Sequence, residues 1–382
     1  MDEDPRRVPR LIMSKRWTAR VSAWAVVTVF LLGAIEAAGL HYSRLMPVQW
    51  QVIQFAVNYP FHVLPDAALG FSMPPNQREM VRTSDYTFLF ETDANGYPNR
   101  DPWPGDPKVV FLGDSLIVGS GVGLDGSSTG LLARMLPDHS ILNLGLPGAG
   151  PERQARIYRR FGGDWHPDVV VSCLFLASDV ENDFHFITWL RDGQGTDYNA
   201  YRLRLGRAER NRGLFQRVLD HSLILDRAAQ PVLRWIEGRD YLETRFRFAD
   251  GTEILFERHA LEFATAPTAA DDPRLDRFVG SMERLRALVE QSGAELLVML
   301  IPSKEELFGA DAATTRLNLA SRMKKRLAAT SLSVLDLYPS LQQGGAARAP
   351  YYAQDFHLNA YGHRIVAEEF AHWLERRREI PD

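Results

Sequence analysis

Alternating strand and helix patterns after residue 105 predict an α/β domain built on a mostly parallel sheet. Short, β-branched apolar runs recur along this region, and helical patterns lie between them. One run, DVVVSCLFL at 168–176, is apolar almost throughout, which is typical of a central parallel strand covered on both faces. With 382 residues, 45% of them hydrophobic, the chain is long enough to bury a large core.

The expected elements follow in chain order. Strands are expected at 108–112, 140–144, 168–176, 295–301 and 333–337. Helices are expected at 127–135, 152–161, 282–292 and 362–377, the first with Ser127 or Ser128 as its N-cap. Between 184 and about 273 the pattern changes to an amphipathic helix over 214–236 and a hairpin turned at Asp250-Gly251. We interpret this stretch as an insertion or cap over the sheet.

The N-terminal region has the pattern of a membrane anchor. Residues 1–20 form a basic tail, and residues 21–41 are apolar over about the length of a bilayer-spanning helix. Basic residues on one side only predict a cytoplasmic N-terminus, an inner-membrane location and a periplasmic or extracytoplasmic main domain. A cleaved signal peptide is the alternative. Residues 42–105 are expected as a juxtamembrane lead-in, and the main domain as residues 106–382.

Composition and spacing exclude several function classes. A formal net charge of -4 gives no basic excess to hold nucleic acid. The ten histidines show no H-x-x-x-H spacing, so we expect no metal site, and we expect no cofactor. The single Cys173 cannot form a disulfide within the chain. The G-x-G-x-x-G pattern at 121–126 lies about eight residues past its strand, too far for a dinucleotide-binding turn.

A catalytic serine needs a base within hydrogen-bond reach and an acid that fixes the tautomer of the base. Ser115 follows the strand KVVFL after Gly113 and Asp114, in the segment FLGDSLIVG, just past a strand end where α/β sheets place their ligands. Asp355 and His357 lie two residues apart, just before the closing helix. An isolated Asp-x-His is typical of a surface turn. Together with the serine segment, the three residues predict a nucleophile, an orienting acid and a base.

These segments resemble the SGNH hydrolases, or GDSL-type esterases, and especially their membrane-anchored bacterial branch. The resemblance rests on ALGFSMPPN, DANGYPNRD, VVFLGDSLIVGSGV, ILNLGLPGAGP, VVVSCLFLASDVEND, LLVMLIPSKEEL and DFHLNAYGHRIVAE. It implies a flavodoxin-like, three-layer α/β/α sandwich and a serine acyl-enzyme mechanism. It also implies Ser115 as nucleophile, His357 as base, Asp355 as its partner, and the backbone N–H groups of Ser115 and Gly148 as oxyanion donors.

The sequence departs from this family at the third oxyanion donor. Where the family usually has an asparagine, this chain has Ser178. A serine hydroxyl is shorter than an asparagine amide and rotates freely, and loss of one oxyanion donor typically costs about 10²–10³ in rate. Ser178 therefore either substitutes imperfectly or marks a slow enzyme. Asn143 and Asn182 are the nearby side chains that could compensate.

Other charged residues near these segments have simpler interpretations. Asp179, Glu181 and Asp183 follow a strand and are expected in a solvated loop rather than as a glycosidase pair, although Asp179 could order the oxyanion loop. Lys304 is expected to begin a helix with a structural role.

The resemblance and the triad together predict a serine esterase. It would remove an acyl group, O-acetyl by family habit, from an envelope or exported carbohydrate, or act on a small ester. One alternative is an O-acyltransferase that works with a membrane acyl-donor partner. The other is a catalytically degenerate domain that binds glycan or scaffolds an assembly.

Overall fold

The computed structural model describes residues 15–41, 63–82, 85–162, 165–193, 195, 197–198, 200–202, 245–256, 261, 264–309, 318–353 and 355–379. Contacts divide the chain into two units. One comprises residues 1–51 and 211–236, and the other comprises 52–210 and 237–382. Of the described elements, α1 (Lys15–His41) belongs to the first unit and all others belong to the second.

The apolar N-terminal run forms a helix, as its composition predicts. α1 spans 27 residues and exposes large apolar side chains, among them Trp24 and Phe30. The predicted transmembrane segment at 21–41 is not confirmed, since none of the helices in the described ranges combines the length and the apolar character needed to cross a bilayer.

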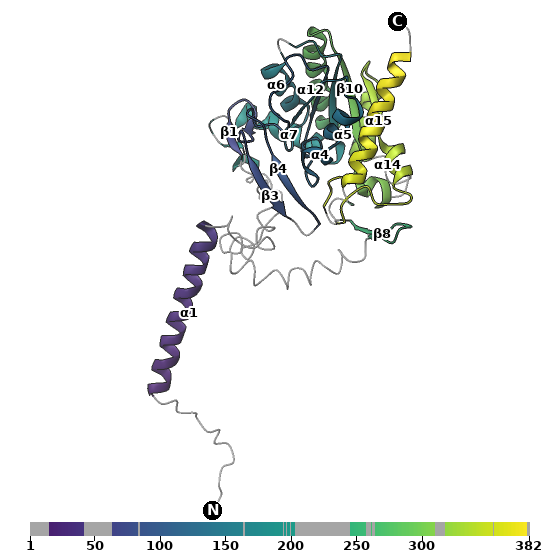
Figure 1. The fold of residues 1–382 in the computed structure, drawn as a ribbon. Helices are drawn as coiled ribbons and strands as arrows, with labels where there is room; N and C mark the ends of the chain where they lie inside the picture. Colours follow the sequence, from purple (N-terminus) through teal and green to yellow (C-terminus); the bar gives the residue numbers. More distant parts are fainter. Residues whose placement is uncertain are drawn as a thin grey trace, which may run out of the picture. The chain divides into compact units, whose positions relative to one another are not determined.

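A five-stranded parallel sheet forms the centre of the second unit (Figure 1). Its strands are β5 (Val109–Gly113), β6 (Ile141–Gly145), β7 (Val169–Phe175), β10 (Glu295–Ile301) and β11 (Ser333–Asp336). Their order is β11-β10-β7-β5-β6, with every neighbouring pair parallel. Numbered along the chain, this is the 2-1-3-4-5 order of flavodoxin-type sheets, in which ligands bind where the order reverses. The five strands lie within two residues of the positions expected from the sequence.

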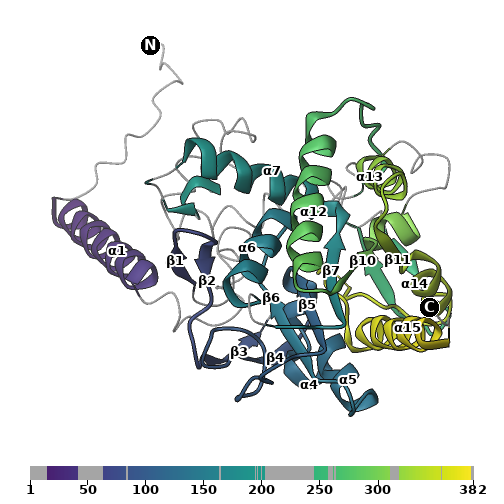
Figure 2. The same ribbon diagram turned by 90° about the horizontal axis from the view of Figure 1, so that it is seen from above.

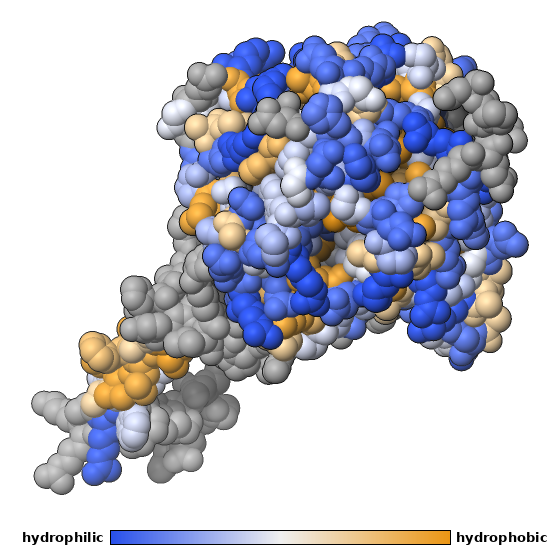
Figure 3. All heavy atoms as spheres, turned by 45° about the horizontal axis from the view of Figure 1, so that its top comes forward, coloured by the Kyte–Doolittle hydropathy of each residue, from blue (hydrophilic) through white to orange (hydrophobic). Residues whose placement is uncertain are grey.

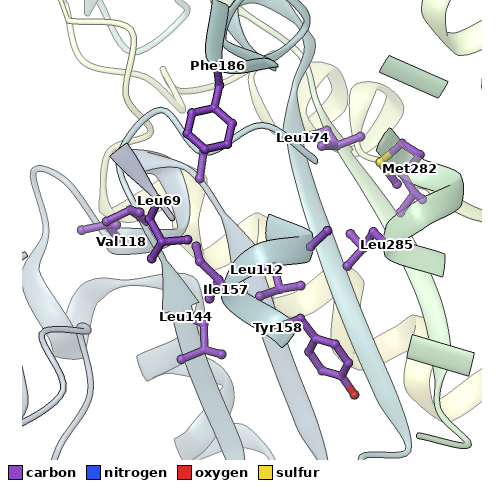
Figure 4. Close-up of a cluster of buried hydrophobic side chains, with 14 of the residues drawn as sticks. Leu69, Leu112, Val118, Leu144, Ile157, Tyr158, Leu174, Phe186, Met282 and Leu285 are labelled. Carbon is purple, nitrogen blue, oxygen red and sulfur yellow. The ribbon is translucent and has the colours of Figure 1, made fainter. Parts of the chain in front are cut away.

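Helices cover both faces of this sheet, which makes three layers (Figure 2). On one face, alternate strand residues such as Leu112 and Leu144 pack against α6 (Pro151–Phe161) and α12 (Pro273–Gln291), as Figure 4 shows. On the other face, Phe111 and its neighbours pack against α5 (Ser128–Met135), α14 (Tyr338–Gly344) and α15 (Ala360–Glu379). The remaining helices are α3 (Ser115–Val118), α4 (Gly123–Gly126), α7 (Leu176–Asp192), α13 (Leu319–Ala328) and the π-helix η2 (Glu305–Gly309).

The lead-in is part of the main body, which corrects the boundary expected at residue 106. Four short strands of the lead-in form two antiparallel pairs, β1 (Leu64–Asp66) with β2 (Gly70–Ser72) and β3 (Arg78–Arg82) with β4 (Thr87–Glu91). Phe71, Phe88 and Phe90 from these strands lie in the same core cluster as the sheet. The alternation in TFLFE, with Phe88 and Phe90 buried, was the period-2 signal of a strand.

The inserted region is described only in part. α7 continues the main body to Asp192, past the expected start of the insertion at 184. The predicted hairpin is confirmed: β8 (Arg245–Arg247) pairs with β9 (Glu253–Leu255), and Gly251 has a φ of 87° at the turn. The helix expected over 214–236 lies outside the described residues. The face of the molecule in Figure 3 is mostly hydrophilic, with scattered apolar patches.

Candidate active site

The turn between β5 and α3 presents Ser115 at the carboxyl end of the sheet. Asp114 is the N-cap of α3, and its carboxylate accepts a 2.9 Å hydrogen bond from the N–H of Leu116. Gly113 permits the tight approach of helix to strand, because a Cβ there would lie 2.7 Å from a side-chain carbon of Ile117. The Ser115 side chain is half-buried and stands at the first helical position.

A short loop before α15 presents Asp355 and His357. The loop is closed by an antiparallel bridge between Tyr351 and Leu358 and by a 3.1 Å bond from the Tyr352 N–H to the His357 carbonyl. Asn359 ties it down, because its amide donates to the carbonyls of Ala349 and Tyr351 while its oxygen accepts from the first turn of α15. The loop is therefore a rigid platform rather than a free surface turn.

The structure brings Ser115, His357 and Asp355 into one hydrogen-bonded chain. Ser115 Oγ lies 2.8 Å from His357 Nε2, and His357 Nδ1 lies 2.6 Å from Asp355 Oδ1. An ionised carboxylate only accepts, so Nδ1 carries the proton, and Nε2 is left to accept the Ser115 hydroxyl proton. His357 is buried, and this is the geometry in which an imidazole activates a serine.

The Asp355 carboxylate is held in its ionised form. Burial would raise its pKa, but the charge of His357 and the hydrogen bonds from His357 and Tyr86 outweigh burial and lower the pKa to about 2. The carboxylate therefore carries its negative charge throughout the neutral range. It can stabilise the imidazolium that forms when His357 takes up a proton.

The segment after β6 brings Gly148 to the same edge of the sheet. β5 and β6 are paired in parallel with Gly113 opposite Gly145, so Ser115 and Gly148 follow neighbouring strand ends. Gly148 has a φ of 63°, a left-handed conformation that favours glycine. The buried guanidinium of Arg153 donates 3.1 Å bonds to the carbonyls of Pro147 and Gly148. These two bonds hold the loop that carries Gly148. The Arg153 guanidinium is itself held by the ring of Phe71, whose centroid lies 4.3 Å from Arg153 Cζ.

Ser178 lies in the first turn of α7, after the third neighbouring strand end. Its side chain is half-buried, and the next residue, Asp179, accepts a 2.8 Å bond from the N–H of Phe175 and so closes the turn between β7 and α7. Ser178 is thus held near the reversal of strand order, where the family resemblance expects its oxyanion asparagine.

The two asparagines considered as substitutes have other partners. Asn143 is buried, and its amide donates to the Ile117 carbonyl and the Thr129 hydroxyl, while its oxygen accepts from Gly145 N–H. The Asn182 oxygen lies 3.5 Å from Arg202 Nη2, and its side chain also bonds Asp179. Asn143 is therefore committed to the turn beneath the site.

Asp179 and Asp183 are buried in α7, which corrects the expected solvated loop. Burial raises the pKa of Asp179 well above its usual range, and the nearby Asp114 raises it further. Asp183 accepts 2.7 Å bonds from the N–H of Glu152 and from the hydroxyl of Ser281. Asp179 therefore closes the turn from β7 into α7, and Asp183 joins α7 to α6 and α12, roles that the two-residue spacing alone did not reveal.

Lys304 supports the Asp-x-His loop from the end of β10. Its side chain is 1% exposed, and Nζ donates to the carbonyls of Ala353 at 3.3 Å and Asp355 at 3.1 Å. The expected structural role is therefore confirmed, although the helix it was expected to begin is the π-helix η2.

A second serine–histidine pair lies outside this site. Ser128 Oγ and His363 Nδ1 are 2.8 Å apart, and both side chains are almost fully buried between α5 and α15. Burial lowers the pKa of His363 to about 3, so the imidazole is neutral and packs as a polar core residue. Within the described ranges, no cluster of histidine, cysteine and acidic side chains could hold a metal ion.

Several residues around the site carried no sequence signal. Tyr86 donates a 2.8 Å bond to Asp355 from 269 residues away, and Arg153 is buried although arginine is usually exposed. The alternation of β4 could have marked the lead-in as folded. Nothing local could have linked Tyr86 to Asp355.

Comparison with known proteins found one family model that is similar to the C-terminal third of the chain. Residues 255–382 match the family described as SGNH hydrolase-like domain, acetyltransferase AlgX. The matched residues include Asp355 and His357. They do not include Ser115, which precedes the matched region. No curated protein matches the chain.

Solved structures with similarity to the chain include three GDSL-type or esterase proteins. A member of the lipolytic protein G-D-S-L family from Veillonella parvula is 10% identical, with 69% of this chain and 96% of that chain covered and a TM-score of 0.37. The acetyl xylan esterase AlAXEase is 14% identical, with 69% and 97% covered and a TM-score of 0.35. The psychrotrophic esterase EstA from Pseudoalteromonas sp. is 11% identical, with 72% and 100% covered and a TM-score of 0.35.

Proposed function

We propose that this chain, which carries an SGNH hydrolase-like domain, is a serine esterase that removes an acyl group from an acylated carbohydrate. The observation that carries the proposal is the hydrogen-bonded chain from Ser115 through His357 to Asp355. The acetyl group is favoured as the acyl group because the matched family is described by an acetyltransferase.

The proposed reaction is acyl transfer through an acyl-enzyme. Ser115 Oγ attacks the ester carbonyl while His357 Nε2 takes the hydroxyl proton, and Asp355 balances the imidazolium. The N–H groups of Ser115 and Gly148 and the hydroxyl of Ser178 are the donors available to the oxyanion. His357 then gives its proton to the leaving alkoxide. Water, deprotonated by His357, releases the carboxylic acid and restores the free serine.

Transfer is the second candidate. In that reaction a sugar hydroxyl rather than water accepts the acyl group from Ser115, and the triad works in the same way. The family description, which names an acetyltransferase, favours this candidate. The half-exposed ring of Phe356 is tilted against the His357 ring, with 4.2 Å between the ring centroids, and gives the base an apolar neighbour against which an acceptor can pack.

The first experiment is hydrolysis of p-nitrophenyl acetate by the full chain, beside Ser115→Ala and His357→Ala. Ser128→Ala is the matched control, because it removes a hydroxyl that lies 2.8 Å from the other buried histidine. We expect turnover in the wild type and in Ser128→Ala, and loss of at least about 10³-fold in the two triad variants. A fluorophosphonate probe should label the wild type at Ser115.

Three outcomes separate the candidates. Release of free acetate from an acetylated oligosaccharide supports the esterase. Acetyl appearing on an added unacetylated oligosaccharide supports transfer. Absence of both turnover and labelling would leave only a glycan-binding or scaffold role. The extracytoplasmic location stays a prediction, and reporter fusions at the C-terminus test it.

A further inference from the structure

The second oxygen of the Asp355 carboxylate is bound by a residue from the lead-in. The Tyr86 hydroxyl donates a 2.8 Å hydrogen bond to Asp355 Oδ2. The other oxygen, Oδ1, accepts from His357 Nδ1–H at 2.6 Å and from the His357 backbone N–H at 2.8 Å. Three donors therefore divide between the two oxygens and fix the plane of the carboxylate.

Tyr86 is itself held rigidly. Its side chain is 9% exposed, and its ring lies 4.5 Å from the ring of Tyr352 and 5.7 Å from that of Phe88. The preceding residue, Asp85, accepts a 2.7 Å bond from the Asp355 backbone N–H. The segment before β4 thus contacts both the side chain and the backbone of Asp355.

We propose that Tyr86 is a positioning residue of the active site, which extends the chain Ser115–His357–Asp355 by a fourth member. The inference rests on the proposed function, because Tyr86 acts through Asp355 and touches none of the reacting atoms. A carboxylate held only through Oδ1 can rotate about its Cβ–Cγ bond, and rotation would carry Oδ1 away from Nδ1. The Tyr86 bond opposes this rotation, so the His357 ring stays aimed at Ser115.

The same bond also acts on the charge distribution of the carboxylate. A donor at Oδ2 draws negative charge away from Oδ1, so removal of the Tyr86 hydroxyl should change the hydrogen bond that Oδ1 accepts from His357 Nδ1.

Other charged and titratable groups around the pair stay in place when only this hydroxyl is removed. Asp355 faces Asp85 and Tyr352, and Lys304 Nζ bonds its backbone carbonyl. His357 acts at a distance on Asp114 and on His363. Burial and the charge of Asp355 raise the pKa of Tyr86, so it remains a protonated donor across the working range.

The test compares Tyr86→Phe with Tyr352→Phe in the full chain. Tyr352 is the matched control, because its ring packs on Tyr86 while its hydroxyl donates to the Gly121 carbonyl at 2.8 Å. We expect Tyr86→Phe to lower kcat on p-nitrophenyl acetate by roughly 10-fold with little change in KM. Tyr352→Phe should keep the wild-type kcat.

A second readout is independent of turnover. The proton shared between His357 and Asp355 should give a downfield N–H resonance, which we assign with His357→Ala. Tyr86→Phe should shift this resonance, and Tyr352→Phe should not. Wild-type turnover that does not depend on Ser115 would overturn the proposed function. An unchanged resonance, or an unchanged kcat in an active enzyme, would overturn the role of Tyr86.

Discussion

Ionisation of the buried Asp183 should make the stability of this protein fall as the pH rises. The side chain is 2% exposed and accepts bonds of 2.7 Å from Glu152 N–H and from the Ser281 hydroxyl. Burial raises its pKa to about 7, against the lowering effect of these two bonds. Asp183→Asn is the perturbation, because an amide keeps the shape and an acceptor oxygen but cannot ionise.

The magnitude follows from the shift in pKa. The carboxyl rises from 3.8 to about 7, so between those values the folded chain holds a proton that the unfolded chain has released. The stabilisation is fully present below pH 3.8 and is lost as the pH rises through 7. At 1.36 kcal/mol per pH unit, the loss is about 4 kcal/mol. The unfolding free energy of Asp183→Asn, minus that of the wild type, should therefore increase by about 4 kcal/mol from pH 4 to pH 8.

Urea denaturation of both chains at pH 4, 5, 6, 7 and 8 measures this difference. Asp192→Asn is the control on the same helix. The exposed carboxylate of Asp192 pairs with Arg191, which lowers the pKa of Asp192. The unfolding free energy of Asp192→Asn, minus that of the wild type, should therefore decrease slightly as the pH rises. A difference for Asp183→Asn that stays constant with pH, or falls, would refute the reasoning.

Two further predictions concern the oxyanion loop and its third donor. Ser178→Asn should raise kcat on an aryl ester by up to about 10-fold, because a longer amide donor reaches the oxyanion better than a hydroxyl; an unchanged or lower kcat would mean that another group completes the oxyanion hole. Arg153→Met should lower the unfolding free energy by about 3 kcal/mol, because it removes two charge-assisted bonds to the loop that carries Gly148. Arg159→Met, on the exposed face of the same helix, should change stability by less than about 0.5 kcal/mol in the same denaturation assay, and equal losses in the two variants would contradict this account.

Local signals in the sequence were enough for the strands of the central sheet, for several of its helices and for three of the site residues. β10 spans the residues that its apolar pattern predicts, and α5 begins at Ser128 with Ser127 as its N-cap. The hairpin around Gly251 follows from turn chemistry between two alternating runs. Ser115, Asp355 and His357 could be proposed because a serine at a strand end and an Asp-x-His turn are patterns of a few residues.

The lead-in and the acidic cluster needed the tertiary structure. Residues 63–91 are rich in turn residues and short strands, and their membership of the main body depends on Phe71, Phe88 and Phe90 finding the sheet core. Asp183 looked exposed because charged residues usually are, and only its bonds to α6 and α12 show why burial is tolerated.

By itself, the sequence determined which segments become strands and helices and which side chains could do acyl chemistry, because both depend on periodicity and short spacing. Only the tertiary structure decided the strand order and the partners of those side chains. The bond from Tyr86 to Asp355 spans 269 residues. Arg153, which holds the loop that carries Gly148, packs against aromatic rings from other elements. Contacts at such separations follow from the packing of the whole core, which no local pattern encodes.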